Sequence, residues 1–115
     1  MAWMVRIDPA DLYLSAVSLA EIRFGIEEMN PGRKRDRFEF WLDTDLRRGF
    51  SARILMVDAV VAEEAGRLIS VAKNKGAKPE LADALIAATA RIHGLRIATL
   101  NRKHFEKLGV ELVKF

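Results

Sequence analysis

The chain contains no cysteine, no internal repeat, no low-complexity segment and no long apolar run. The absence of cysteine excludes disulfide scaffolds, thiol catalysis and cysteine-bound zinc, and a small domain without disulfides is typical of a reducing compartment. No apolar stretch reaches the length that a bilayer-spanning helix needs. Residues 1–6 are too few and too interrupted to form a secretory signal peptide. We therefore expect a cytoplasmic protein.

The composition is that of a globular chain with a modest excess of positive charge. Half of the 115 residues are hydrophobic and 30% are charged, which suits one small core in a single domain over residues 1–115. The net charge is +3 and the isoelectric point is about 9.5. Such an excess of Lys and Arg permits binding to phosphate backbones, but many proteins with other functions are equally basic.

Strand and helix patterns alternate along the chain. The expected strands cover residues 12–17, 54–57, 95–100 and 110–113. The expected helices cover 19–29, 33–48, the stretch between Asp58 and Gly76, the stretch between Pro79 and Gly94, and a short turn at 102–108. Residues 84–90 are apolar or small nearly all round, so their helix is expected to be buried on most sides. This alternation indicates an α/β fold with a parallel sheet covered by helices.

Three polar residues fall at or just beyond the carboxyl ends of these strands, where sites form in such sheets. Glu21 lies one turn into the first helix, Asp83 lies one turn into the helix after Pro79, and Asn101 directly follows a strand. Carboxylates gathered from several helix starts can hold Mg²⁺ or Mn²⁺. Such an ion can activate water for attack on a phosphodiester.

Each of these residues also has a purely structural interpretation. Ser18 and Glu21 have the spacing of a capping box, in which Glu21 reaches back to the Ser18 backbone. Asp83 lies where the helix dipole favours a negative charge, and Asn101 is an ordinary N-cap. The local patterns alone do not decide between capping and catalysis.

Basic residues crowd the helix expected over 33–48, and they are candidates for contact with RNA phosphates: Arg33, Lys34, Arg35, Arg37, Arg47 and Arg48. A solvated helix face is the alternative interpretation. His93 and His104 lack the spacing of metal ligands, and we interpret both as structural or surface residues. Phe38 and Trp41 are interpreted as core residues rather than as platforms for base stacking.

Three segments, in this order, resemble the PIN-domain ribonucleases of the VapC and FitB toxin type. Residues 12–26, LYLSAVSLAEIRFGI, resemble the segment with the family's second acid. Residues 81–90, LADALIAATA, resemble the third-acid helix, and residues 97–105, IATLNRKHF, resemble the fourth-acid strand and turn. The resemblance extends from about Asp11 to Phe115. It implies a three-layer α/β/α fold around a central parallel sheet.

The resemblance also implies roles for individual residues. Glu21 and Asp83 become the metal-site carboxylates, Asn101 takes the fourth position, and Thr99 supports that end of the site. The family implies Mg²⁺ or Mn²⁺ and an RNA substrate, often tRNA or rRNA. It further implies a homodimer and a cognate VapB-like antitoxin, whose C-terminal segment covers the active site.

The sequence departs from the family near its start. PIN domains of this kind open with a central strand that ends in an Asp-Thr-Asn type motif and supplies the first acid, and no such motif precedes Glu21. We expect that strand to be missing, with residues 2–4 as a remnant of the end of the first helix, which would leave two unpaired strand edges. Asp8 and Asp11 belong to a loop and are not assigned the missing role. Position 104 is His where many relatives carry Asp.

Two functions fit this sequence. The first is a metal-dependent endoribonuclease, the toxin of a type II toxin–antitoxin pair, with a start that has been placed too late. The second is an inactive or truncated remnant that only binds antitoxin, a partner chain or RNA. A generic α/β domain whose acids are all helix caps is disfavoured by the order of the three segments.

Overall fold

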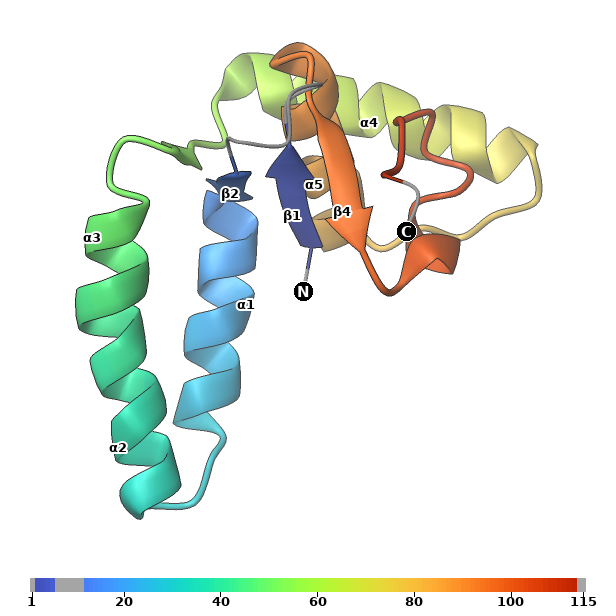
Figure 1. The fold of residues 1–115 in the computed structure, drawn as a ribbon. Coiled ribbons are helices and arrows are strands. Elements are labelled where there is room, and N and C mark those ends of the chain that lie inside the picture. Colours follow the sequence, from blue (N-terminus) through green and yellow to red (C-terminus); the bar gives the residue numbers. More distant parts are fainter. Residues whose placement is uncertain (1, 6–11, 114–115) are drawn as a thin grey trace.

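The computed structural model describes residues 2–5 and 12–113 and shows a sheet flanked by helices (Figure 1). The strands are β1 (Ala2–Val5), β2 (Leu12–Ser15), β3 (Ile54–Leu55) and β4 (Arg96–Thr99). The helices are α1 (Ala16–Glu27), α2 (Arg33–Phe40), the π-helical segment η1 (Trp41–Leu46), α3 (Arg47–Gly49), α4 (Ala59–Asn74), α5 (Leu81–Ile92) and the 3₁₀ turn η2 (Arg102–His104). Asp8 and Asp11 lie outside the described residues.

The sheet has the strand order β3-β2-β1-β4. β2 and β3 run parallel, whereas β1 runs antiparallel to both of its neighbours, β2 and β4. It follows that β2, β3 and β4 share one direction, as the sequence predicts. The strand expected over 110–113 is reduced to a parallel bridge between Ile97 and Leu112. This is the α/β architecture that the sequence indicates, with one reversed strand in its centre.

The reversed strand corrects two expectations about the start of the chain. Residues 2–4 are not the end of a helix, because they pair along both edges of β1: Met4 lies opposite Tyr13 on one side and Ile97 on the other. The two strand edges expected to be unpaired are therefore both hydrogen-bonded to β1. A strand that satisfies its backbone on two sides removes the exposed edges that favour aggregation.

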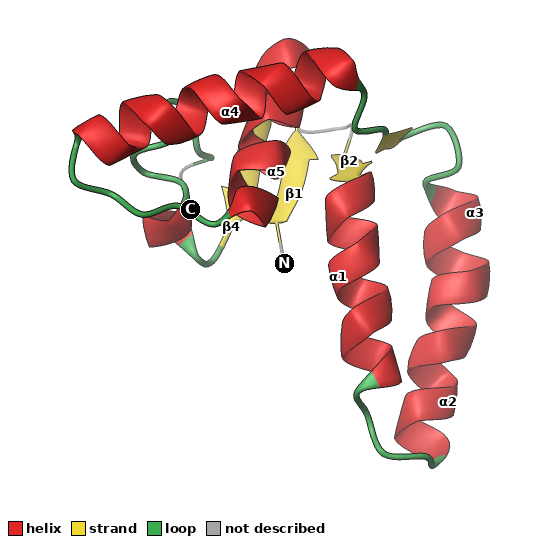
Figure 2. Ribbon diagram, turned by 180° about the vertical axis from the view of Figure 1, so that it is seen from behind, coloured by secondary structure: helices red, strands yellow, loops and turns green. Residues whose placement is uncertain are grey.

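Side chains of β1 alternate between two hydrophobic clusters, as the period of a strand requires. Ala2 and Met4 belong to a cluster of fifteen buried residues shared with α4 and α5. Trp3 packs against a smaller cluster, whose four buried members are Leu14, Ile26, Leu42 and Leu46. Figure 2 shows α4 and α5 on one side of the sheet, which is the side of the larger cluster. The sheet thus separates two cores of unequal size.

Helices α1 and α2 form an antiparallel pair that projects beyond the sheet (Figure 1). We call residues 16–49 the arm, and we call α4, α5 and the segment from β4 to residue 113 the body. The helical run predicted over 33–48 is confirmed as α2, η1 and α3 in succession. α2 contains no buried residue, and its side chains form ion pairs from Arg35 to Glu27 and Glu39.

Candidate functional site

The polar residues singled out in the sequence line one small cavity of about 130 Å³ at the end of β4. Glu21 comes from α1, Asp83 from the first turn of α5, and Thr99 and Asn101 from the end of β4. Its other lining residues are Ala2, Glu80, Ile86, His104 and Phe105. Three segments far apart in the sequence therefore meet at one point, and we call this cavity the acid pocket.

Asp83 is fixed in the acid pocket by the burial of its helix. α5 has six buried residues, Ala84, Ile86, Ala87, Ala88, Thr89 and Ala90, which hold it against the larger core. The side chain of Asp83 is only 13% exposed. This burial raises the pKa of the Asp83 carboxyl above its usual value; Glu80 acts in the same direction, and His104 opposes them.

Glu21 is an exposed acid of the pocket, and it does not form the capping box considered as its structural alternative. α1 begins one turn earlier than a Ser18 cap requires, because the Ser15 hydroxyl accepts a hydrogen bond from the Val17 N–H at 3.0 Å. Ser18 is buried, and its hydroxyl donates to the carbonyl oxygen of Ala2 at 3.3 Å. Glu21 therefore has no role as a capping-box partner.

Thr99 and Asn101 form the end of β4 beside the two acids. Thr99 is 3% exposed, and its hydroxyl oxygen accepts a hydrogen bond from the Asn101 N–H at 3.0 Å. The side chain of Asn101 makes no capping hydrogen bond to η2, so the N-cap expected there is not formed by the amide. The side chain of Asn101, which is exposed, lines the acid pocket instead.

Two residues of the acid pocket were missed in the sequence. His104 was interpreted as structural or surface, yet its Nδ1 lies 3.3 Å from Oδ2 of Asp83. Glu80 precedes Asp83 by three residues, the spacing that places two side chains on one helix face. The signal for Glu80 was present in that spacing. No local pattern pairs His104 with Asp83, because the contact joins two segments that only the fold brings together.

The donor set of the acid pocket suits a hard divalent cation in its chemistry. Carboxylate and amide oxygens are the ligands of Mg²⁺ and Mn²⁺, and Mg²⁺ commonly keeps several water ligands beside one or two carboxylates. Within residues 2–5 and 12–113, no three Asp, Glu, His or Cys side chains are gathered closely enough to hold one ion together. The residues present therefore fit a partly hydrated ion and do not form a closed protein cage.

The sequence model of the family described as PIN domain matches residues 1–111 of this chain. The chain belongs to the PIN-domain family. The PIN domain is 34% identical to "VapC ribonuclease Y4jK" of Sinorhizobium fredii over 113 residues, which cover 98% of this chain and 81% of that protein. It is 35% identical to "Toxin FitB" of Neisseria gonorrhoeae over 91% of this chain and 76% of that protein.

Solved structures give the same result for the fold of this PIN domain. The structure of FitAB bound to an IR36 DNA fragment matches with a TM-score of 0.82 and 33% identity, over 88% of this chain and 71% of that chain. The crystal structure of FitAcB from Neisseria gonorrhoeae matches with the same TM-score and 34% identity, over 89% and 73% of the two chains. The PIN-like α/β fold expected from the sequence is thereby confirmed.

Proposed function

We propose that this PIN domain is a metal-dependent endoribonuclease and the toxin of a VapBC-like pair. The observation that carries this proposal is the meeting of Glu21, Asp83, Thr99 and Asn101 in one cavity, although they come from three separate segments. Helix caps have no reason to converge on a common point. The similarity to a VapC ribonuclease and to the toxin FitB gives the convergence its chemical interpretation.

In this proposal Glu21 and Asp83 hold Mg²⁺ or Mn²⁺. The side chain of Asn101 is the third polar group beside the ion. Such an ion, when bound, supplies activation of water and stabilisation of the leaving oxygen. Asn101 has an amide group that can donate to a phosphate oxygen, and the Thr99 hydroxyl fixes the turn from which that amide projects. His104 holds the Asp83 carboxylate in place through the contact between Nδ1 and Oδ2.

The test is cleavage of a mixed pool of cellular RNA by the purified chain with Mn²⁺ or Mg²⁺ and with EDTA. Asp83→Asn keeps the size of the side chain and removes the charge, so we expect cleavage to fall by more than about 100-fold, since even residues that only support metal ligands cost 10–100-fold. Glu63→Gln, on the exposed face of α4, makes the same charge change and should leave cleavage unaltered. Cleavage that survives Asp83→Asn or EDTA would refute the assignment.

Partners follow from the same relationship. We propose a VapB-like antitoxin as partner, supported by the similarity to FitB and to the solved FitAB structures. A homodimer is proposed only from the resemblance of the sequence to the family. The basic residues of α2, Arg33, Lys34, Arg35 and Arg37, were predicted from the sequence as contacts for RNA, but none of them lines the acid pocket. Three of them are exposed, and Arg35 is held by Glu27 and Glu39.

A second candidate function is a module that binds antitoxin, a second chain or RNA without turnover. One observation favours it: the described residues hold no cluster of three ligands for a single ion. Isothermal titration calorimetry with Mn²⁺ separates the two candidates. The metal-dependent enzyme must bind Mn²⁺, and Asp83→Asn should weaken that binding. Folded protein that gives no isotherm and cleaves no RNA would favour the binding module.

A further inference from the structure

A larger hollow of about 310 Å³ adjoins the acid pocket and shares Glu80, Asp83 and His104 with it. Three lysines line this hollow: Lys78 from the segment before α5, Lys103 from η2, and Lys107 just beyond it. We call it the lysine groove. Because it shares residues with the acid pocket, a ligand lying in the groove can extend directly to Asp83.

The lysines of the groove are available to an anionic ligand. All three are exposed, and within residues 2–5 and 12–113 none of them forms an ion pair. Lys107 donates to the carbonyl oxygen of Lys75 at 3.1 Å, which anchors the groove to the end of α4 while leaving the ammonium charge uncompensated. The structure shows no hydrogen bond from Lys78 or Lys103 to another described residue.

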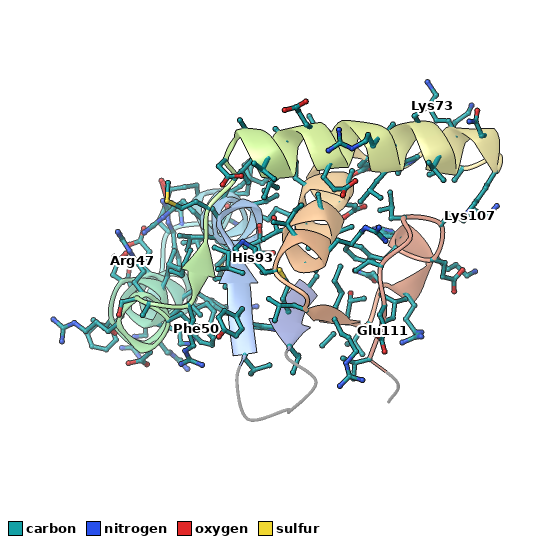
Figure 3. The ribbon with its side chains drawn as sticks, turned by 90° about the horizontal axis from the view of Figure 1, so that it is seen from above. Arg47, Phe50, Lys73, His93, Lys107 and Glu111 are labelled. Atoms are coloured by element: carbon teal, nitrogen blue, oxygen red, sulfur yellow. The ribbon has the colours of Figure 1, made fainter. Side chains whose placement is uncertain are left out.

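The basic cluster of α2 differs from the lysine groove in position. Figures 1 and 2 both place α1 between α2 and the body that carries Asp83. Seen from above, Arg47 of the arm and Lys107 of the groove lie on opposite sides of the molecule (Figure 3). Lys34 and Arg37 line a separate hollow with Phe38 and Trp41, and none of these residues belongs to the acid pocket. A strand bound only there would lie against α2 rather than beside Asp83.

We infer that the lysine groove binds the phosphate backbone of single-stranded RNA and leads it to the acid pocket. This inference rests on the proposed function for the nature of its ligand. A single-stranded backbone needs a track of cations, and Lys78 and Lys103 supply two point charges beside Asp83. Glu80, Asp83 and Glu106 also line the groove and oppose an anion, so removal of the Glu106 charge should have the opposite effect to loss of a lysine.

The test uses two double variants that change the charge equally. Lys78→Ala with Lys103→Ala alters the groove, and Lys34→Ala with Arg37→Ala alters the hollow on α2; all four residues are exposed. Binding of a fluorescein-labelled, mixed-sequence RNA of about 15 nucleotides is followed by fluorescence anisotropy in EDTA, across a salt series. EDTA prevents metal-dependent cleavage, so binding is measured apart from turnover.

We expect the groove variant to weaken binding about tenfold at low salt and to lower the salt slope by about 1.4, since each phosphate contact to a single strand contributes about 0.7. The α2 variant should change the Kd less than about twofold, and Glu106→Gln should tighten binding. Equal losses in both double variants would overturn the inference, because net charge alone would then explain them. A larger loss in the α2 variant, or no RNA binding by the unaltered chain, would also overturn it.

RNA binding in EDTA tests the lysine groove, and cleavage with metal tests the proposed ribonuclease, so either hypothesis can fail without the other. Selective loss in the groove variant supports the inference whether or not the chain cleaves RNA in the metal-containing assay. Cleavage by the unaltered chain that the groove variant fully retains, together with unchanged binding, would leave the ribonuclease standing and overturn the groove. Replacement of both groove lysines by Arg should restore binding, which excludes a loss through misfolding.

Discussion

The body buries more residues than the arm does, and the acid pocket contains Asp83 from the body and Glu21 from the arm. Fifteen residues are buried in the cluster that α4 and α5 share with the sheet, whereas the cluster beneath the arm has four. Asp83 stands on the well-buried α5, and Glu21 stands exposed on α1. The site therefore combines Asp83, on a helix with many buried residues, with Glu21, on a helix with few. Local opening of the arm would separate the two carboxylates.

The largest effect should come from a cavity in the body. Ile86 is 1% exposed and Ile92, on the same helix, is 40% exposed. Ile86→Ala should lower the free energy of unfolding by about 2–5 kcal/mol, because it removes buried methyl groups and leaves a void. Ile92→Ala, the matched control, should cost well under half of that. Urea denaturation measures both, and equal costs would show that α5 is not packed as described.

A smaller effect should follow from the burial of Asp83 itself. Since its pKa is raised in the folded chain, the folded state holds a proton that the unfolded state releases, so stability is lost as pH rises above 3.8 through the folded pKa. Asp83→Asn avoids this loss. In EDTA the Tm of Asp83→Asn relative to that of the unaltered chain should therefore rise as pH increases above 3.8. If the Tm of Asp83→Asn instead fell relative to that of the unaltered chain as pH rises, the pKa of Asp83 would not be raised in the folded state.

The smallest effect should come from the ion pairs of the arm. Arg23 NH2 lies 2.7 Å from Oδ1 of Asp43, which links α1 to η1, and both side chains are well exposed. Asp43→Asn should therefore cost about 0.5 kcal/mol or less, because solvent screens an exposed pair. Asp45→Asn makes the same charge change in η1, and Asp45 forms no ion pair with another residue of the described ranges 2–5 and 12–113. A loss of more than about 1 kcal/mol for Asp43→Asn, with no such loss for Asp45→Asn, would show that the Arg23–Asp43 ion pair stabilises the arm more than an exposed pair should.

Elements with a strong local signal were predictable from the sequence. The apolar stretch of α5 predicted its burial. The helix expected between Asp58 and Gly76 is α4, and Asp58 caps it, with its carboxylate accepting from the Val61 N–H at 2.9 Å. Glu21 and Asn101 follow the strands β2 and β4, at the edge of the sheet where sites form, whereas Asp83 follows α4 and was assigned to the site by the resemblance of its helix to the family. Each of these conclusions depends on residues near one another in the sequence, or on a general rule of topology.

The features that escaped prediction depend on contacts across the whole chain. β1 is only four residues long, and its pairing with β4 is decided by partners more than ninety positions away, which no local period reveals. The sequence pattern placed the cap of α1 at Ser18, but Ser15 forms the cap, and the Ser18 hydroxyl donates to the Ala2 carbonyl oxygen instead. The contact of His104 with Asp83 escaped for the same reason.

The pairing of β1 with β4 also affects the order in which the sheet can form during synthesis. Residues 2–5 are synthesised long before residues 96–99, which pair with all four of them along one edge of β1. Closing so long a loop is slow, because its entropy must be lost before the pairing compensates for it. The nascent chain must therefore carry one unpaired edge of β1 until residues 96–99 have been synthesised, so the centre of the sheet is completed only then.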